Sequence, residues 1–237
     1  VQMIDKSPIL ITGIPRSGAS MIAGVLNICG AFCGDVSLHK GSFENGGIMR
    51  MIEGSFLQSI GCDPMGQYPL PERIDYIPVG WHKLVVTQMI SEGYKGGPWF
   101  YKSSRASLLW RIWHNAFPNA KWVIVRRRTG DVIQSCLKTG YMKAFKDENI
   151  RRKVGVNSES EGWLWMVHEY EKRFVEMIEE GLNCKIIWPE RMVYGDYGQL
   201  YELLEWVGLK WKSEVLSFID PLLDKSRQRK GGEGDGK

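Results

Sequence analysis

Residues 13–20 have the composition of a loop that binds an anion. They read Gly-Ile-Pro-Arg-Ser-Gly-Ala-Ser and join an apolar run over 9–14 to a stretch, 18–28, whose apolar residues recur at helical spacing. A glycine-bounded turn that opens a helix directs backbone N–H groups toward one point, where the helix dipole adds partial positive charge. Arg16 adds a full charge inside the loop. We therefore expect the loop to bind a phosphate or sulfate group.

The same loop departs from the pattern of nucleotide kinases at one position. The spacing matches G-x-x-x-x-G-K-S/T, but Ala19 stands where that pattern has its lysine. That lysine holds the β- and γ-phosphates and the hydroxyl after it binds magnesium, so ATP-dependent phosphoryl transfer is poorly supported. A plain strand-to-helix turn with an incidental arginine is the alternative. The position of the loop, directly after a strand and before a helix, favours phosphate binding.

A second candidate anion site follows the apolar run over 121–126. Arg127 comes directly after that run, Asp131 lies four residues later, and Ser135 lies a further four residues on, within a predicted helix. Arginine and serine side chains both donate hydrogen bonds to anions, and Asp131 would cap or orient the turn. The alternative is a basic strand end with an acidic residue favoured by the helix dipole. The sequence does not separate the roles of the neighbours Arg126 and Arg128.

Short apolar runs alternate with longer helical patterns along the chain. Strands are predicted over 9–14, 99–102, 121–126 and 184–188, and helices over 18–28, 106–116, 130–137, 162–180 and 199–207. Strands separated by helices imply crossover connections, and hence an α/β fold with a parallel sheet flanked by helices. Such a sheet binds ligands at the carboxyl ends of its strands. We expect one domain over 1–237, with a basic, glycine-rich tail over 225–237.

The composition is that of an ordinary globular protein. The 237 residues are 43% hydrophobic and 24% charged, and the net charge of +4 is spread along the chain, which argues against a nucleic-acid partner but suits a phosphate-bearing ligand. No apolar run approaches the length of a membrane span and no signal peptide opens the sequence, so we expect a cytoplasmic protein. Cys29 and Cys33 lie one helical turn apart without a second ligand pair, and no metal site is expected.

Together, the two anion-binding segments resemble those of sulfotransferases that use 3′-phosphoadenosine-5′-phosphosulfate, in particular a bacterial or phage-like branch. The first resembles the 5′-phosphosulfate loop G-x-P-R/K-S-G-T-S/T, and the second resembles R-x-x-x-D-x-x-x-S. The resemblance implies a P-loop-like fold in which Arg16 binds the sulfate and 5′-phosphate. It also implies that Arg127 and Ser135 grip the 3′-phosphate. Ala19 departs from the usual threonine and removes one hydroxyl contact.

Further segments extend the resemblance across most of the chain. The stretch over 99–113 resembles W-x-x-K-D-P-R-x-S-L and retains Lys102, Arg105 and Ser107. The stretch over 39–47 resembles N-x-K-G-x-F-E and supplies Lys40, Gly41, Phe43 and Glu44. The tail resembles the R-K-G loop that closes over the 3′-phosphate. The resemblance thus implies donor binding by Gly13, Pro15, Arg16, Ser17, Gly18, Ala19, Ser20, Arg127, Ser135, Arg229, Lys230 and Gly231.

The implied reaction is sulfuryl transfer to a hydroxyl or amine, which needs positioning and charge neutralisation and does not require a metal. The histidine that cytosolic sulfotransferases carry in a K-T-H run is absent after Lys102. Other branches of the family use a glutamate from an earlier segment, so the resemblance implies Glu44 as the candidate base, with His39 as a weaker alternative. Lys102 and Arg16 are the candidate cations at the leaving group. Alternatively, Glu44 has a structural role only, as a capping residue or as the ion-pair partner of a nearby lysine such as Lys40.

Two other functions are compatible with the sequence. One is a kinase-like nucleotide enzyme, against which Ala19 counts. The other is a non-catalytic protein of the same fold that binds the donor or adenosine 3′,5′-bisphosphate. The segments over 44–97 and 139–162 are expected to be irregular and to form the wall and lid for the acceptor. The acceptor is expected to be a small molecule, carbohydrate or lipid, and the oligomeric state is not encoded in any motif.

Overall fold

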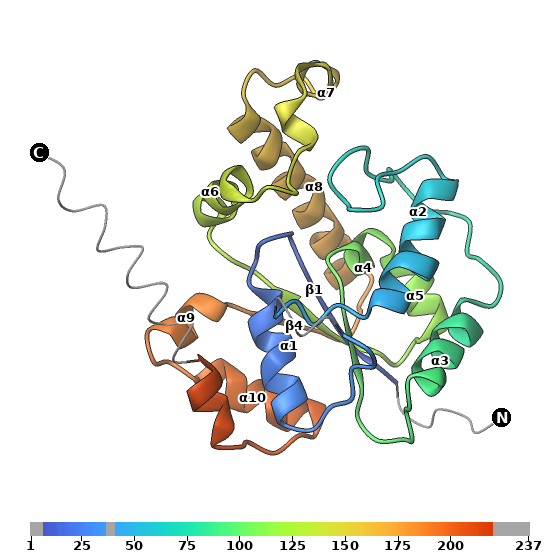
Figure 1. Ribbon diagram of the computed structural model, residues 1–237, viewed down its shortest axis with the longest axis vertical. Helices are drawn as coiled ribbons and strands as arrows, with labels where there is room; N and C mark the ends of the chain where they lie inside the picture. The colour runs from blue at the N-terminus through green and yellow to red at the C-terminus, as the bar shows by residue number, and fades with distance from the viewer. Residues whose placement is uncertain (1–6, 37–40, 220–237) are drawn as a thin grey trace, which may run out of the picture.

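A computed structural model describes residues 7–36 and 41–219 of the chain, and within these the strands form one parallel sheet (Figure 1). The strands are β1 (Ile9–Gly13), β2 (Phe100–Lys102), β3 (Lys121–Val125) and β4 (Cys184–Ile187). Their order is β2-β1-β3-β4, and Ile9 lies opposite both Phe100 and Lys121. The predicted α/β fold with a parallel sheet is confirmed.

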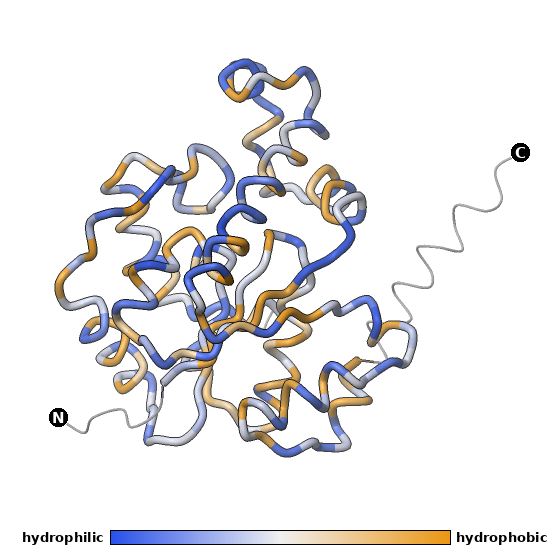
Figure 2. The backbone as a smooth tube through the Cα atoms, turned by 180° about the vertical axis from the view of Figure 1, so that it is seen from behind, coloured by the Kyte–Doolittle hydropathy of each residue, from blue (hydrophilic) through white to orange (hydrophobic). Residues whose placement is uncertain are grey.

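Both faces of the sheet are buried along β1, β2 and nearly all of β3, which is why these strands are nearly continuous apolar runs. Successive side chains of β1 point to opposite faces. Ile9 and Ile11 join one hydrophobic cluster, whereas Leu10 joins the other. Strand β3 alternates in the same way, with Val123 on the first side and Trp122 on the second. Hydrophobic residues accordingly concentrate along the central strands, while helix α7 (Glu148–Lys153) is largely hydrophilic (Figure 2).

Helices cover the two faces of the sheet. Helices α1 (Ala19–Ile28), α9 (Pro189–Val193) and α10 (Gly198–Val207) pack against the face of Ile9 and Ile11. Buried residues of α3 (Trp81–Ser91), α5 (Trp110–Ala116), α6 (Thr129–Lys138) and α8 (Glu159–Glu179) pack with Leu10 on the opposite face. The remaining elements are η2 (Ile48–Gly54), α2 (Ser55–Ser59), α4 (Arg105–Leu108) and η3 (Ala144–Lys146).

The predicted helix boundaries are close to the observed ones, with two informative differences. Helix α8 begins at Glu159, earlier than predicted, because Ser158 and Glu161 form a capping box that satisfies N–H groups at the helix start. The helix predicted over 106–116 is two helices, α4 and α5, separated at Leu109. The tryptophans buried in the core include Trp81, Trp99, Trp110, Trp113 and Trp163. Another, Trp165, is partly buried.

The prediction that residues 44–97 are irregular is wrong in part. This segment contains the π-helix η2, helix α2 and helix α3, while 139–162 contains η3, α7 and the start of α8. Ile52, Leu57 and Met89 hold the helical parts of the first segment against the core. Burial of these apolar residues against the core therefore stabilises helices in a segment predicted to be irregular. None of the described helices is both long and apolar enough to cross a membrane.

Candidate active site

The loop between β1 and α1 lies at the carboxyl end of the sheet, on the same side as α6 and the projecting α7 (Figure 1). Gly13 is required here, because a Cβ atom at its position would lie 2.5 Å from the backbone oxygen of Val125. Arg16 has a φ of 75°, which is uncommon for a residue with a side chain, and Gly18 has a φ of 91°. The loop therefore keeps its shape at some cost in backbone strain, as binding loops often do.

The amino end of α1 is open to an anion. Its first N–H groups have no acceptor within the helix, and no side chain among the described residues caps them. Ser17 donates its backbone N–H to the backbone oxygen of Ile14, and its buried hydroxyl has no hydrogen-bond partner among the residues that the structure describes. Ala19 packs its methyl group into the core, so that position offers only its backbone to a ligand. Pro15 is half-buried between these residues.

Arg16 connects the two predicted anion sites. Its Nε donates to the Ser135 hydroxyl on α6 at 3.0 Å, and its Nη1 donates to the Tyr141 hydroxyl at 3.1 Å. Arg127 donates from Nη1 to the backbone oxygen of Arg16 at 3.2 Å. The structure thus brings Arg16 together with Arg127 and Ser135. Both partners lie more than one hundred positions after Arg16 in the sequence.

The three consecutive arginines after β3 have different partners. Arg126 pairs with Glu171 at 2.7 Å, and Arg128 pairs with Glu190 at 3.1 Å. Among the residues that the structure describes, Arg127 makes no ion pair with a carboxylate, and neither does Arg16. The sequence does not distinguish the roles of these three arginines, whereas the ion pairs in the structure do. Arg127 and Arg16 hold the positive charge that is available to an anionic ligand.

Lys102 and Glu44, both predicted to be catalytic, contact each other. The Lys102 Nζ lies 2.8 Å from Glu44 Oε1. Burial lowers the pKa of Lys102, and the Glu44 carboxylate opposes that shift. Ser20 on α1 donates its hydroxyl to the backbone oxygen of Ser42, which ties the start of the Glu44 segment to the anion loop. A carboxylate and an ammonium group therefore lie next to the loop as a potential base and a potential leaving-group cation.

A buried carboxylate behind this pair was not predicted. Glu53, in the π-helix η2, is fully buried and accepts hydrogen bonds from the Tyr101 hydroxyl at 2.7 Å and the Ser103 hydroxyl at 2.7 Å. It also accepts from Trp113 Nε1 at 2.9 Å, and Arg105 Nε lies 3.5 Å away. Burial raises the pKa of Glu53, and the Arg105 charge opposes that shift. This cluster fixes the chain on both sides of Lys102.

Several predicted residues lie outside the described part of the chain. These are Arg229, Lys230 and Gly231, the tail over 225–237, and the candidates Lys40 and His39. The lysine proposed as the alternative partner of Glu44 is among them, whereas the observed partner is Lys102. Within the described ranges, no group of three or more His, Cys, Asp or Glu side chains is arranged to hold a metal ion.

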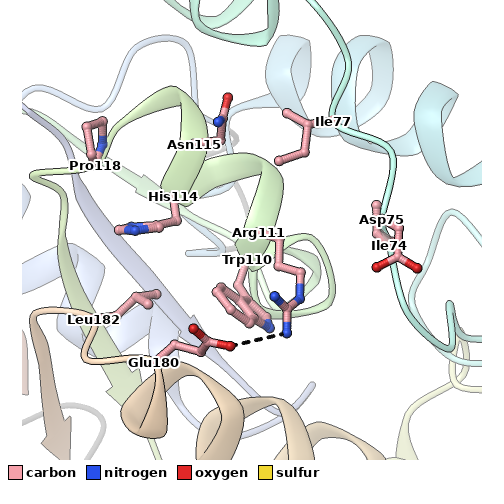
Figure 3. A pocket seen from close by; sticks show the side chains of 10 residues that line it. All are labelled: Ile74, Asp75, Ile77, Trp110, Arg111, His114, Asn115, Pro118, Glu180 and Leu182. Carbon is pink, nitrogen blue, oxygen red and sulfur yellow. Dashed lines mark ion pairs between the residues drawn. The ribbon is translucent and has the colours of Figure 1, made fainter.

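A pocket of about 430 Å³ lies elsewhere, where α5 ends and β3 and β4 begin (Figure 3). Trp110 and Leu182 line it together with Arg111, which reaches toward Glu180 at 3.7 Å, and His114. These residues belong to the amino ends of the strands, whereas ligands of parallel sheets bind at the carboxyl ends. The pocket therefore does not belong to the site that Arg16 and Lys102 form.

Comparison with solved structures identifies the fold. The sulfotransferase domain from the curacin biosynthetic pathway aligns with a TM-score of 0.55 at 14% identity, over 90% of this chain and 77% of that one. Sulfotransferase STF9 from Mycobacterium avium aligns with a TM-score of 0.55 at 12% identity, over 93% and 68% of the two chains. By sequence, the chain matches no family profile and no curated protein. The fold predicted from the two anion motifs is confirmed: this chain has the sulfotransferase fold.

Proposed function

We propose that this protein is a sulfotransferase that moves a sulfuryl group from 3′-phosphoadenosine-5′-phosphosulfate to a hydroxyl or amine of an acceptor. The observation that carries the proposal is the contrast among three arginines. Arg126 and Arg128 are neutralised by glutamates, whereas Arg127 pairs with no carboxylate in the described ranges and reaches the loop of Arg16. Two such arginines favour a ligand with two anionic groups, because charge-assisted hydrogen bonds are the strong ones.

The residues present fit this donor. The open amino end of α1 and the Arg16 guanidinium suit the phosphosulfate. Arg127, after the end of β3, and Ser135, on α6, each form a hydrogen bond with Arg16. These two side chains suit the 3′-phosphate. Ala19 at the position of the kinase lysine favours this donor over ATP, since nothing at that position reaches a γ-phosphate.

When bound, the donor supplies a sulfuryl group attached through a bridging oxygen to a phosphate that leaves. Glu44 would accept the proton of the acceptor hydroxyl as its oxygen bonds to sulfur, in the manner of a general base. Lys102 and Arg16 would neutralise the negative charge that collects on the bridging oxygen as its bond to sulfur breaks. Lys102 contacts Glu44, and we propose that its ammonium group also reaches the bridging oxygen of a bound donor.

The acceptor enters, in this proposal, from the side of Glu44. The carboxylate is about one third exposed and lies in a segment that is anchored to α1 through the Ser20 hydroxyl. Loops on a rigid scaffold usually determine specificity. We propose a small molecule, a carbohydrate or a lipid headgroup as the acceptor, because each offers a hydroxyl or amine that can approach such a carboxylate.

The test is calorimetric binding of adenosine 3′,5′-bisphosphate, ADP and ATP with magnesium to the full chain. Tight binding of the bisphosphate without magnesium, together with weak binding of ADP, is the expected result. A preference for ATP with magnesium would overturn the proposal in favour of a kinase-like enzyme. Release of the bisphosphate from the phosphosulfate donor, measured across hydroxyl and amine acceptors, then separates an enzyme from a protein that only binds the nucleotide.

A further inference from the structure

Tyr141 lies three residues after the end of α6, and its side chain reaches the anion loop. The side chain is 52% exposed, yet its hydroxyl accepts a hydrogen bond from Arg16 Nη1 at 3.1 Å, across 125 positions of sequence. The same guanidinium donates to Ser135 from Nε. Tyr141 therefore belongs to the group of side chains around Arg16, although no motif in the sequence marks it.

The backbone that carries Tyr141 is held by a single buried amide. Gln67 is 5% exposed and donates from Nε2 to the backbone oxygen of Tyr141 at 2.9 Å. Its Oε1 accepts from the backbone N–H groups of Lys143 at 2.9 Å and Ala144 at 3.2 Å. Burying an amide costs free energy unless it is hydrogen-bonded. Here three hydrogen bonds fix the backbone over 141–144, and this restricts where the Tyr141 side chain can place its hydroxyl.

The loop that carries Gln67 is held by three hydrogen bonds. The Asp63 carboxylate accepts from the backbone N–H groups of Met65 and Gln67. Tyr170 on α8 donates its hydroxyl to the backbone oxygen of Gly66 at 2.8 Å. Through these contacts the loop over 63–70 is fastened to α8, so Gln67 transmits the position of a rigid helix to Tyr141.

An anionic ligand can take the place of the two hydroxyl groups that accept hydrogen bonds from Arg16. A hydroxyl can accept a hydrogen bond or, after rotation, donate one. When the phosphosulfate of the donor takes the N–H groups of Arg16, the hydroxyls of Ser135 and Tyr141 become free to donate to the second anionic group of the same ligand. A carboxylate partner would instead compete with the ligand, and in the described part of the chain Arg16 has none.

We propose that Tyr141 is a ligand of the donor's 3′-phosphate and that Gln67 is the residue that positions it. The inference rests on the proposed function. The 3′-phosphate is assigned because Tyr141 follows the helix of Ser135 and shares the Arg16 guanidinium with it, on the side where Arg127 lies. Tyr141 then discriminates nucleotides that carry a phosphate on the ribose from those that do not.

The first experiment compares adenosine 3′,5′-bisphosphate with adenosine 5′-monophosphate on the full-length Tyr141→Phe variant. Loss of one hydrogen bond to a phosphate is expected to weaken the bisphosphate about tenfold and to leave the monophosphate within about twofold. Tyr201→Phe is the matched control, since that side chain is 51% exposed and packs on Trp211, away from the anion loop. Unchanged bisphosphate affinity, or equal losses for both nucleotides, would overturn the role of Tyr141.

The second experiment tests whether Gln67 acts through Tyr141. Gln67→Leu removes all three hydrogen bonds, and we expect a loss of bisphosphate affinity as large as that of Tyr141→Phe. In the double variant the two losses should be far from additive, because both remove the same contact. A lower melting temperature alone would not produce that coupling. Additive losses would overturn the positioning role.

The outcomes also separate this inference from the function on which it rests. If the wild-type chain prefers the bisphosphate and Tyr141→Phe keeps that preference, the Tyr141 assignment fails while the proposed function stands. If the wild-type chain shows no preference for the bisphosphate over the monophosphate, both fail.

Discussion

The ammonium group of Lys102 lies 2.8 Å from the carboxylate of Glu44, although the two residues are 58 positions apart. Lys102 ends β2, and Glu44 lies in the segment that precedes the π-helix η2. The Lys102 side chain is largely buried and that of Glu44 is partly buried, so solvent screens this pair less than a surface salt bridge. The same contact brings together a group that can accept a proton and a group that can neutralise a leaving oxygen.

Replacing Glu44 with Gln should separate these two roles. Glutamine keeps the shape of the side chain but cannot accept the acceptor's proton, and general-base catalysis typically contributes 10²–10⁴-fold. We expect a fall in kcat of about a hundredfold or more, with the affinity for adenosine 3′,5′-bisphosphate nearly unchanged. The measurement is steady-state turnover beside calorimetry on the same preparation. Unchanged kcat would remove Glu44 from the mechanism.

The pH dependence of turnover should report Lys102. Burial lowers the pKa of Lys102 below its ordinary 10.5, so a rising pH removes its charge earlier than for an exposed lysine. The cation at the leaving oxygen is present below that lowered pKa and lost above it. We therefore expect kcat to fall on the alkaline side with an apparent pKa under 10.5. In Lys102→Arg, whose charge persists, this alkaline fall should be absent, and an identical fall would contradict the assignment.

Glu44→Gln should also shift that alkaline limb. The Glu44 carboxylate opposes the lowering of the Lys102 pKa, so its neutralisation should lower that pKa further. The residual activity of Glu44→Gln should then decline at a lower pH than that of the wild type. If the activity of Glu44→Gln declines at the same alkaline pH as that of the wild type, a group other than Lys102 causes the decline.

Arg127→Ala should weaken ligands that carry a 3′-phosphate and spare those that do not. Charge-assisted hydrogen bonds contribute about 1.5–3 kcal/mol each, which corresponds to at least about tenfold in affinity. Arg128→Ala is the control, because that arginine pairs with Glu190 and is largely exposed. Calorimetry with adenosine 3′,5′-bisphosphate and adenosine 5′-monophosphate provides the comparison. Equal losses for both nucleotides with Arg127→Ala would refute the 3′-phosphate assignment.

Local sequence patterns predicted the parts of the site that local structure determines. The strands are apolar runs because both faces of the sheet are buried, and the loop after β1 is recognisable because glycines and a helix start occur in sequence. The sequence predicts Arg16 after one strand and Arg127 and Ser135 after another strand of the same parallel sheet, whose strands have their carboxyl ends at one edge. The contacts of Arg16 with Ser135 and of Arg127 with the Arg16 backbone agree with that expectation.

Contacts that depend on tertiary packing could not be predicted. The helices over 48–59 and 81–91 have mixed, glycine-flanked sequences without a clear helical motif, and burial of their apolar residues against the core decides their structure. Glu53 resembles any surface glutamate in the sequence, and its hydrogen-bond donors come from strand β2 and helix α5. Gln67 lies in a segment without any recognisable pattern, and only the fold brings it to the loop of Tyr141.

Glu53 leads to a prediction about stability. The carboxylate is fully buried and is surrounded by donors, among them the guanidinium of Arg105, which is also buried. Glu53→Gln would leave Arg105 without its countercharge and would introduce an amide N–H₂ among groups that already donate. Removing one partner of a buried ion pair costs about 3–5 kcal/mol, so the free energy of unfolding should fall by about that amount.

The measurement for Glu53 is denaturant unfolding at neutral pH, with Glu148→Gln as the control. Glu148 pairs with Arg152 on the exposed surface of α7, and loss of such a pair costs about 0.2–1 kcal/mol. A paired substitution, Glu53→Leu with Arg105→Met, should recover part of the stability, because an apolar pair of similar volume avoids the desolvation cost of two buried charges. If Glu53→Gln is no more destabilising than Glu148→Gln, the Glu53 carboxyl is already neutral in the folded protein. Arg105 must then be compensated by other groups, among them the Glu44 carboxylate, whose charge also raises the pKa of Arg105.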